Sequence, residues 1–191
     1  GFCLCSLARI NVCRWGQAYR LIKTKSPQPK VRESTQMRHV QLKAPGTENL
    51  VLAEVERPKP GPGEVLVKVH AASINYRDFL IAMGFYGSPG LTLPLVPLSD
   101  GAGQVVEVGD GVTQIQAGDR VTSLFWQDWT DGFATGTNRS ISTGCEAPGM
   151  LTEYALLPDS AVARFPDNLS YDEAATLPCA GRRPCVETRR C

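Results

Sequence analysis

Short stretches of alternating apolar residues, each ended by glycine or proline, recur over most of the chain. The clearest is Glu64–His70 (EVLVKVH), which follows the Gly/Pro run Pro58–Gly63. Its residues Val65, Val67 and Val69 share one face, because successive side chains of a strand point to opposite sides. Many short strands that are separated by such turns are typical of a barrel or sandwich and not of a parallel sheet.

The same pattern indicates further strands and two helices. A helical run, Tyr76–Met83, follows the clearest strand, and Ser170 with Glu173 has the spacing of a capping box that opens a second helix. We therefore predict a mainly β fold with short helices. The other expected strands are Arg38–Lys43, Asn49–Val55, Gln104–Val108, Asp119–Leu124, Leu151–Leu157 and Ala161–Phe165.

A polar cluster lies where the clearest strand meets the first helix. It consists of Asn75, Arg77 and Asp78 in the segment AASINYRD. Polar groups at such a junction can project into a cleft while the strand holds them rigidly, which is how binding residues are often mounted. The simpler interpretation is that Asn75 and Asp78 only cap the helix. Both roles can hold together, and we favour a role in a pocket.

Four more segments accompany this junction in a fixed order, and together they carry a resemblance. They are PGPGEVLVKV before it and, after it, Pro94–Gly103 (PLVPLSDGAG), Val105–Val121 (VVEVGDGVTQIQAGDRV) and Gly149–Pro158 (GMLTEYALLP). Residues 37–181 thereby resemble the GroES-like catalytic domain of the medium-chain dehydrogenase/reductase superfamily, which includes alcohol dehydrogenases. The branch they resemble is the zinc-free, quinone-oxidoreductase-like one.

The resemblance implies a GroES-like irregular β-barrel followed by a helix that leads to a dinucleotide-binding Rossmann domain. The glycine fingerprint of that domain does not follow Gly181, so we expect the Rossmann domain to be missing from this chain. The expected divisions are an unassigned basic extension (1–36), the catalytic domain (37–165), the start of the linking helix (166–181) and an aberrant tail (182–191).

The resemblance also implies site residues. Asn75, Asp78 and Tyr86 match the catalytic Asn, Asp and Tyr of the quinone-reductase branch, and Asn75, Tyr76 and Tyr86 are the expected cofactor-binding residues. In that branch the Asn and Tyr line the pocket where nicotinamide and substrate meet, and the Asp fixes the loop. The implied cofactor of the complete enzyme is NADP(H) or NAD(H).

Both zinc sites of the zinc-dependent relatives lack their ligands in this sequence. Asn75 stands where those relatives have a catalytic Cys, and Ser99 and Asp100 stand where they have His and Glu. Their structural zinc needs four closely spaced cysteines, whereas the corresponding region offers Cys145 only. Amide and hydroxyl groups are not usual zinc ligands, so we expect no zinc.

Three other candidates have simpler interpretations. Gly101 and Gly103 imitate a dinucleotide fingerprint, but the third position is Val106 and a strand follows instead of a helix, so we expect a tight barrel turn. His70 could relay a proton, although a structural role is favoured. Cys179 is expected to be a small buried apolar side chain.

Charge and cysteine usage limit the partners. Residues 1–36 carry seven Lys or Arg and one acidic residue, whereas residues 37–181 carry nine Lys or Arg and seventeen acidic residues. We therefore expect no nucleic-acid partner, and the lack of a long apolar run predicts no membrane partner. Seven cysteines without framework spacing indicate free thiols and a cytoplasmic location. Residues 1–36 could be a mitochondrial leader, or upstream sequence joined to a true start at Met37. We favour the upstream sequence.

These observations predict a zinc-independent, NAD(P)H-dependent oxidoreductase acting on small quinone, enone or carbonyl substrates, with a homodimer in the complete enzyme. We expect the present chain to be inactive alone. The alternatives are a zinc-type alcohol dehydrogenase and a non-catalytic β-barrel module. The long polar stretch Phe125–Met150, which contains Trp126, Trp129 and Phe133, is unassigned, and loops of this length are usually functional.

Overall fold

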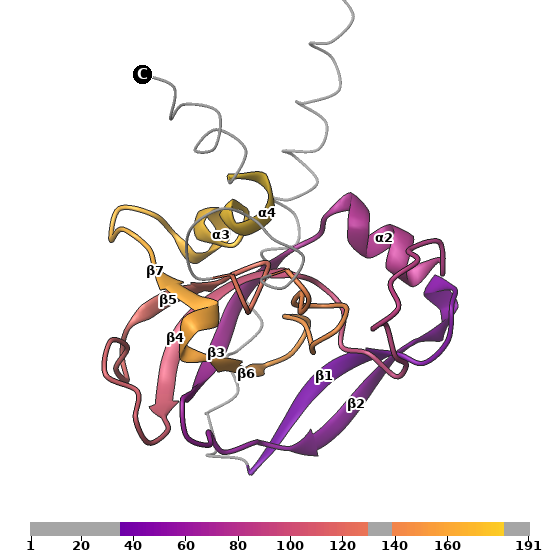
Figure 1. Ribbon diagram of the computed structural model, residues 1–191. Coiled ribbons are helices and arrows are strands. Elements are labelled where there is room, and N and C mark those ends of the chain that lie inside the picture. Colours follow the sequence, from indigo (N-terminus) through magenta and orange to yellow (C-terminus); the bar gives the residue numbers. More distant parts are fainter. Residues whose placement is uncertain (1–34, 130–138, 182–191) are drawn as a thin grey trace, which may run out of the picture. The chain divides into compact units, whose positions relative to one another are not determined.

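The computed structural model describes residues 35–129 and 139–181 (Figure 1). The predictions for the basic extension, for part of the long loop and for the tail therefore fall largely or wholly outside the described residues. Strands dominate the described part and its helices are short, which confirms the predicted mainly β class. None of these helices is both long and apolar enough to cross a membrane.

The longest strand of the described part is β3 (Glu64–Ser73), which lies within a five-stranded antiparallel sheet ordered β6-β3-β4-β5-β7. A separate two-stranded ribbon, β1 with β2, reaches the rest of the barrel through the bridges His39–Thr152 and Leu42–Leu95. The other strands are β1 (Gln36–Leu42), β2 (Leu50–Glu56), β4 (Asp100–Val108), β5 (Arg120–Ser123), β6 (Tyr154–Pro158) and β7 (Val162–Arg164).

The main core is formed by the face of β3 that the alternating pattern predicts. Val65 and Val67 are fully buried against valines of β4 and β5 and against Met150, while Val69 packs on the edge of this cluster. Removal of this apolar surface from water is the main stabilising contribution to such a domain. Leu66 on the opposite face is also fully buried, so β3 is covered on both sides.

The α-helices within the described residues, α2 (Tyr76–Ala82), α3 (Tyr171–Ala174) and α4 (Leu177–Ala180), lie at one end of the sheet (Figure 1). Ser170 forms the predicted capping box with Glu173. The expected linking helix is, however, divided into α3 and α4. Pro178 in the first turn of α4 has no N–H to donate, and its ring excludes a helical carbonyl four residues earlier. Two 3-10 turns, Thr47–Asn49 and Asp159–Ala161, complete the elements.

The expected turn at Gly101 and Gly103 is wrong, because both glycines lie inside β4. They serve close packing instead. A Cβ atom on Gly103 would lie 2.2 Å from the carbonyl oxygen of Lys68 on the neighbouring strand, and one on Gly101 would lie 2.7 Å from the Cβ of Met150. The glycines therefore allow β4 to approach its neighbours closely.

Candidate active site

Asn75 and Asp78 are tied together at the start of α2. They form a capping box, and the backbone N–H of Asn75 donates to Asp78 Oδ2 at 2.8 Å. Asp78 is only 4% exposed, and burial is the main cause that raises the pKa of its carboxyl. The helix therefore begins at a buried carboxylate that holds the Asn75 backbone through this hydrogen bond. Asp78 is placed to position Asn75.

The amide of Asn75 retains a donor that the fold does not use. Its Nδ2 atom is buried and has no hydrogen-bond partner among the described residues. A buried donor without a partner is costly, and such groups call for an explanation. Ile74 and Tyr76 on either side of it are 78% and 75% exposed. An unused amide donor between two exposed apolar side chains is suited to donate a hydrogen bond to an oxygen of a bound molecule.

Ser99 and Asp100 lie beside this junction, because β4 pairs Asp100 with Ser73 of β3. Both residues are fully buried. Ser99 Oγ donates to Asp100 Oδ1 at 2.6 Å, and the backbone N–H of Cys179 donates to Asp100 Oδ2 at 2.9 Å. Both carboxylate oxygens of Asp100 therefore already accept hydrogen bonds from the protein.

Tyr86 lies beyond the opposite end of α2, which is about 10 Å long at 1.5 Å per residue. Its ring packs on the apolar cluster that includes Leu42 and Ile81, and the Arg77 guanidinium lies 5.6 Å from the ring centroid. Among the contacts of the described residues, none joins Tyr86 to Asn75. The structure thus ties Asn75 directly to Asp78, whereas Tyr86 packs on the Leu42 and Ile81 cluster and reaches the start of α2 through Arg77.

Arg77 connects α2 to the segment 139–147. It donates to Ser142 Oγ at 2.8 Å and to the carbonyl oxygen of Thr143, and its guanidinium lies 4.3 Å over the ring of Phe125. A planar guanidinium can donate in its plane while its face stacks on an aromatic ring. The sequence placed Arg77 in the polar cluster, but its role in holding this segment depends on residues about 65 positions away.

Glu146 is the negative centre of the same segment. It accepts hydrogen bonds from Ser88 and Ser142, and from Cys145 Sγ at 3.4 Å. Burial acts to raise the pKa of Glu146, but the hydrogen bonds from Ser142 and Ser88 outweigh it and hold the pKa at about 2. Burial, with the nearby Glu146 charge, raises the pKa of the Cys145 thiol to about 11. Cys145 is thus a neutral thiol at pH 7.

Two other predicted residues are placed as follows. His70 stacks on Tyr171 with ring centroids 4.4 Å apart, and burial, followed by the charge of Lys68, lowers its pKa. The prediction that Cys179 is buried is wrong, since its side chain is half-buried at the end of α4. The reason is that α4 is a single short turn on the surface of β4, with Leu177 and Ala180 exposed.

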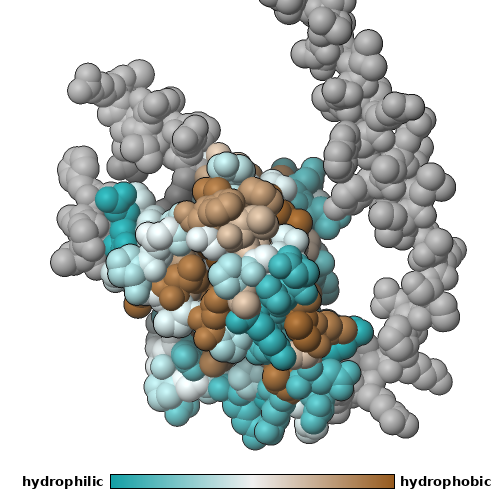
Figure 2. Space-filling model, turned by 90° about the vertical axis from the view of Figure 1, so that its right-hand side faces the viewer, coloured by the Kyte–Doolittle hydropathy of each residue, from teal (hydrophilic) through white to brown (hydrophobic). Residues whose placement is uncertain are grey.

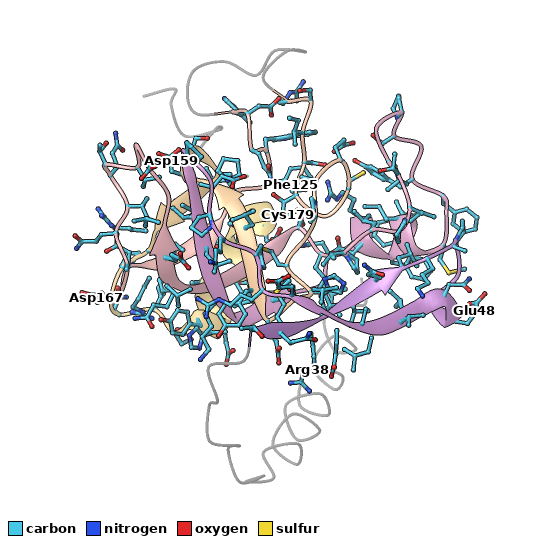
Figure 3. The ribbon with its side chains drawn as sticks, turned by 90° about the horizontal axis from the view of Figure 1, so that it is seen from below. Arg38, Glu48, Phe125, Asp159, Asp167 and Cys179 are labelled. Carbon is cyan, nitrogen blue, oxygen red and sulfur yellow. The ribbon has the colours of Figure 1, made fainter. Side chains whose placement is uncertain are left out.

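Two hollows border the segment that sequence analysis left unassigned. One, of about 180 Å³, is lined by Phe125, Trp126, Trp129, Pro178 and Cys179. The other, of about 380 Å³, is lined by Tyr86 and Trp126 together with residues 87–90, Arg139, Ser140 and Glu146. Figure 3 shows Phe125 and Cys179 near one another. The only signal in the sequence was the occurrence of aromatic residues in an otherwise polar loop.

The face that carries α2, β1 and β2 shows apolar side chains among polar ones (Figure 2). The exposed apolar residues of these elements and of the turn after α2 include Leu52, Phe79 and Phe85, which are 63%, 48% and 72% exposed. Within residues 35–129 and 139–181, no three His, Cys, Asp or Glu side chains are close enough together to hold a metal ion.

Comparison with known proteins agrees with this architecture. The alcohol dehydrogenase GroES-like domain family matches residues 61–167. A zinc-type alcohol dehydrogenase-like protein of Schizosaccharomyces pombe is 46% identical over 136 residues, which are 71% of this chain and 39% of that protein. The chain thus spans about two fifths of the length of this relative.

Solved structures give the same result. A thermostable alcohol dehydrogenase from Pyrobaculum aerophilum with bound cobalt and zinc superposes with a TM-score of 0.67 at 32% identity, over 75% of this chain and 45% of that one. The quinone oxidoreductase from Coxiella burnetii superposes with a TM-score of 0.62 at 26% identity, over 76% of this chain and 42% of that one. The chain belongs to the alcohol dehydrogenase GroES-like domain family, within the medium-chain oxidoreductases.

Proposed function

We propose that this domain is the catalytic part of an NAD(P)H-dependent reductase that works without zinc and acts on quinone, enone or related carbonyl compounds. The observation that carries the proposal is the unpartnered amide donor of Asn75, held by Asp78 at the start of α2. In an oxidoreductase family, a fixed donor of this kind is suited to a carbonyl oxygen that becomes negative during reduction.

The residues at the family's catalytic zinc position do not fit a zinc ion. Zinc is held by thiolate, imidazole or carboxylate groups. Of the three residues at this position, Asn75 offers an amide and Ser99 a hydroxyl that already donates to Asp100. Asp100 is the only carboxylate of the three, and its two oxygens accept from Ser99 and from the N–H of Cys179. A single carboxylate engaged by the protein is not a zinc site.

A nicotinamide cofactor fits the same position better. Bound NAD(P)H would supply the hydride, and this chain would supply orientation and hydrogen bonds. Asn75 Nδ2 would donate to an amide or carbonyl oxygen, and Asp78 would hold the Asn75 backbone in place. Tyr76, which is 75% exposed beside Asn75, would offer an aromatic surface and help to exclude water. Tyr86 stays a predicted site residue, and its ring reaches the Asn75 end of α2 through Arg77.

Elemental analysis of the purified protein separates this proposal from a zinc-type alcohol dehydrogenase. That alternative rests on the relatives whose names include zinc. We expect no stoichiometric zinc after dialysis against a weak chelator. One tightly bound zinc ion per chain would show that the zinc-free proposal is wrong.

Measurements of enzymatic activity test the proposed reductase function. The chain as given spans about two fifths of the length of the Schizosaccharomyces pombe relative, so activity is measured on a version extended to that relative's full length. We expect this version to oxidise NADPH with a quinone, and the present chain to bind NADPH very weakly and to show no turnover. Saturable micromolar binding of NADPH to the present chain would contradict the second expectation.

Two substitutions in the extended version test the site. Asn75→Ala and Tyr86→Phe should lower kcat more than they weaken cofactor binding, because the proposed contacts are made with the reacting groups. Asn49→Ala, which removes an exposed amide that donates to the Pro45 carbonyl, serves as the control and should leave kcat unchanged. An extended version that binds NADPH but reduces nothing would favour the non-catalytic module. The cytoplasmic location and the homodimer stay predictions.

A further inference from the structure

The strand β2 (Leu50–Glu56) lies at the outer edge of its sheet. Of the strands in residues 35–129 and 139–181, only β1 pairs with it. The N–H of Val40 donates to the Leu151 carbonyl oxygen at 2.9 Å, so the other edge of β1 is occupied. The two-stranded ribbon therefore ends at β2 (Figure 1).

The register shows which backbone groups lie on the free edge of β2. Opposite residues of an antiparallel pair alternate between those that exchange hydrogen bonds and those whose N–H and C=O groups point outward. Val40 directs its N–H away from β2 and lies opposite Leu52. Leu52 therefore directs its own N–H and C=O away from β1, and so do Glu54 and Glu56, which follow at the same spacing.

This edge is long, exposed and partly apolar. Leu50, Val51 and Leu52 are 37%, 38% and 63% exposed. The outer strands of the five-stranded sheet are shorter, since β6 has five residues and β7 has three, whereas β2 has seven. A long exposed edge strand with apolar side chains is a template for pairing with another chain. Among the described strands, β2 is therefore the one best suited to such pairing.

A second copy of β2 fits this edge. When two copies run antiparallel about a two-fold axis at Ala53, Leu52 of one copy lies opposite Glu54 of the other. The outward N–H and C=O groups of these two residues then exchange hydrogen bonds. Glu56 lies opposite Leu50 in the same way, so no glutamate of β2 lies directly opposite another across the axis.

Neighbouring registers fit less well. An axis at Glu54 sets the two Glu54 carboxylates directly opposite each other, and like charges in this position are destabilising. An axis at Leu52 leaves Val55 and Glu56 beyond the end of the other strand. The axis at Ala53 therefore pairs all seven residues of β2 without opposing like charges.

The assembly closes at two copies. Each copy contributes β2 once and the two-fold axis uses both edges, so no edge of β2 remains for a third copy. The formal net charge of the chain is only +1, which gives little long-range repulsion between copies. One strand pair buries less surface than a standard protein interface, so we expect a dissociation constant in the micromolar range.

We propose that two copies of this chain associate through β2, antiparallel and about a two-fold axis at Ala53, to form a continuous sheet in the order β1-β2-β2-β1. The proposal does not rest on the reductase function, since it involves neither Asn75 nor a cofactor. It is therefore tested on the 191-residue chain itself.

Sedimentation velocity of the chain at concentrations from about 1 to about 200 μM tests whether a dimer forms. We expect the sedimentation coefficient to rise across this range from that of a monomer to that of a dimer. A monomer at every concentration overturns the proposal.

Leu52→Glu tests the edge and its register. The new carboxylate lies opposite Glu54 on both sides of the axis, so the dissociation constant should rise about tenfold. Adding Glu54→Lys to this variant sets opposite charges across the axis and should restore the dimer. Ile141→Glu adds the same charge at a side chain that is 42% exposed outside β2, and it should leave the dimer unchanged. Equal dimerisation of the two single glutamate variants overturns the proposal, and a double variant that stays weak contradicts the register.

A cross-link gives a second measurement of the register. Ala53→Cys places two thiols opposite each other across the axis, where the Cβ atoms of such a pair are about 4.5–5.5 Å apart. Mild oxidation should yield a disulfide between position 53 of one copy and position 53 of the other, which mass spectrometry of the peptides identifies. Val55→Cys is the control, because position 55 lies opposite Val51 of the other copy and should not bond to itself. Equal yields of the two disulfides contradict an axis at Ala53.

Discussion

The backbone N–H of Cys179 donates to the buried carboxylate of Asp100, over a sequence separation of 79 residues. This hydrogen bond joins the last helix of the described part, α4, to the strand β4 next to the proposed site. Asp100 also accepts from Ser99. Asp100 therefore has a structural function, because it ties α4 and the Ser99 hydroxyl to the start of β4.

Asp100→Ala should lower the free energy of unfolding by about 2–3 kcal/mol, because it leaves the Ser99 hydroxyl and the Cys179 N–H without an acceptor in the interior. Asp100→Asn keeps one acceptor oxygen and should cost less. Urea denaturation measures both. The control is Asp167→Ala, which removes a fully exposed carboxylate 3.8 Å from Arg120 and should change stability by less than about 0.5 kcal/mol. Equal effects at the two positions would contradict the assignment.

Arg77→Ala should loosen the segment 139–147 without unfolding the barrel. The variant loses hydrogen bonds from a charged donor to Ser142 and Thr143, each of which is worth about 1.5 kcal/mol or more. The Thr143 amide, which donates to the carbonyl of Phe125 at 3.0 Å, should then exchange its hydrogen about tenfold faster. Hydrogen exchange with mass spectrometry of peptides covering 139–147 measures this.

The control for this experiment is Arg57→Ala. Arg57 also has its guanidinium over an aromatic ring, that of Tyr154 at 4.4 Å, but it makes no contact with the segment 139–147. The Arg57→Ala variant should leave hydrogen exchange in the segment 139–147 unchanged. Unchanged exchange in Arg77→Ala would show that the segment is held by its other hydrogen bonds.

Glu146→Gln should destabilise the protein at pH 7 but not near pH 2. The folded pKa of Glu146 is about 2, below its ordinary value of 4.5. Such a carboxylate contributes stability that is fully present above pH 4.5 and is lost as the pH falls through 2. The difference in free energy of unfolding between wild type and variant should therefore shrink over that range. Urea denaturation at pH 7, 5, 3 and 2 tests this, with the exposed Glu48→Gln as the control.

Gly103→Ala should destabilise the domain by about 3 kcal/mol or prevent folding, because its new methyl group meets the Lys68 carbonyl oxygen at 2.2 Å. Gly87→Ala adds the same methyl group where no atom lies within 4 Å, so it should change stability by less than about 0.5 kcal/mol. Thermal denaturation of the two variants compares them directly. Similar melting temperatures would mean that β3 and β4 can move apart at little cost.

The sequence alone determined the features that depend on neighbouring residues. Alternation predicted that Val65 and Val67 face the core, and the spacing of Ser170 and Glu173 predicted a helix start that the structure contains. The strand-to-helix junction at Asn75 was found in the same way. These features are local, because side-chain direction in a strand and the first turn of a helix are set within a few residues.

Only the tertiary structure decided what these elements contact. The pairing of β3 with β4 places Ser99 and Asp100 beside Asn75, and the same packing requires glycine at position 103 within a strand. The hydrogen bond from Arg77 to Ser142 joins residues 65 positions apart, and the one from Cys179 to Asp100 joins residues 79 positions apart. No local pattern encodes such pairs, because the order of the strands, and not the spacing along the chain, brings their atoms together.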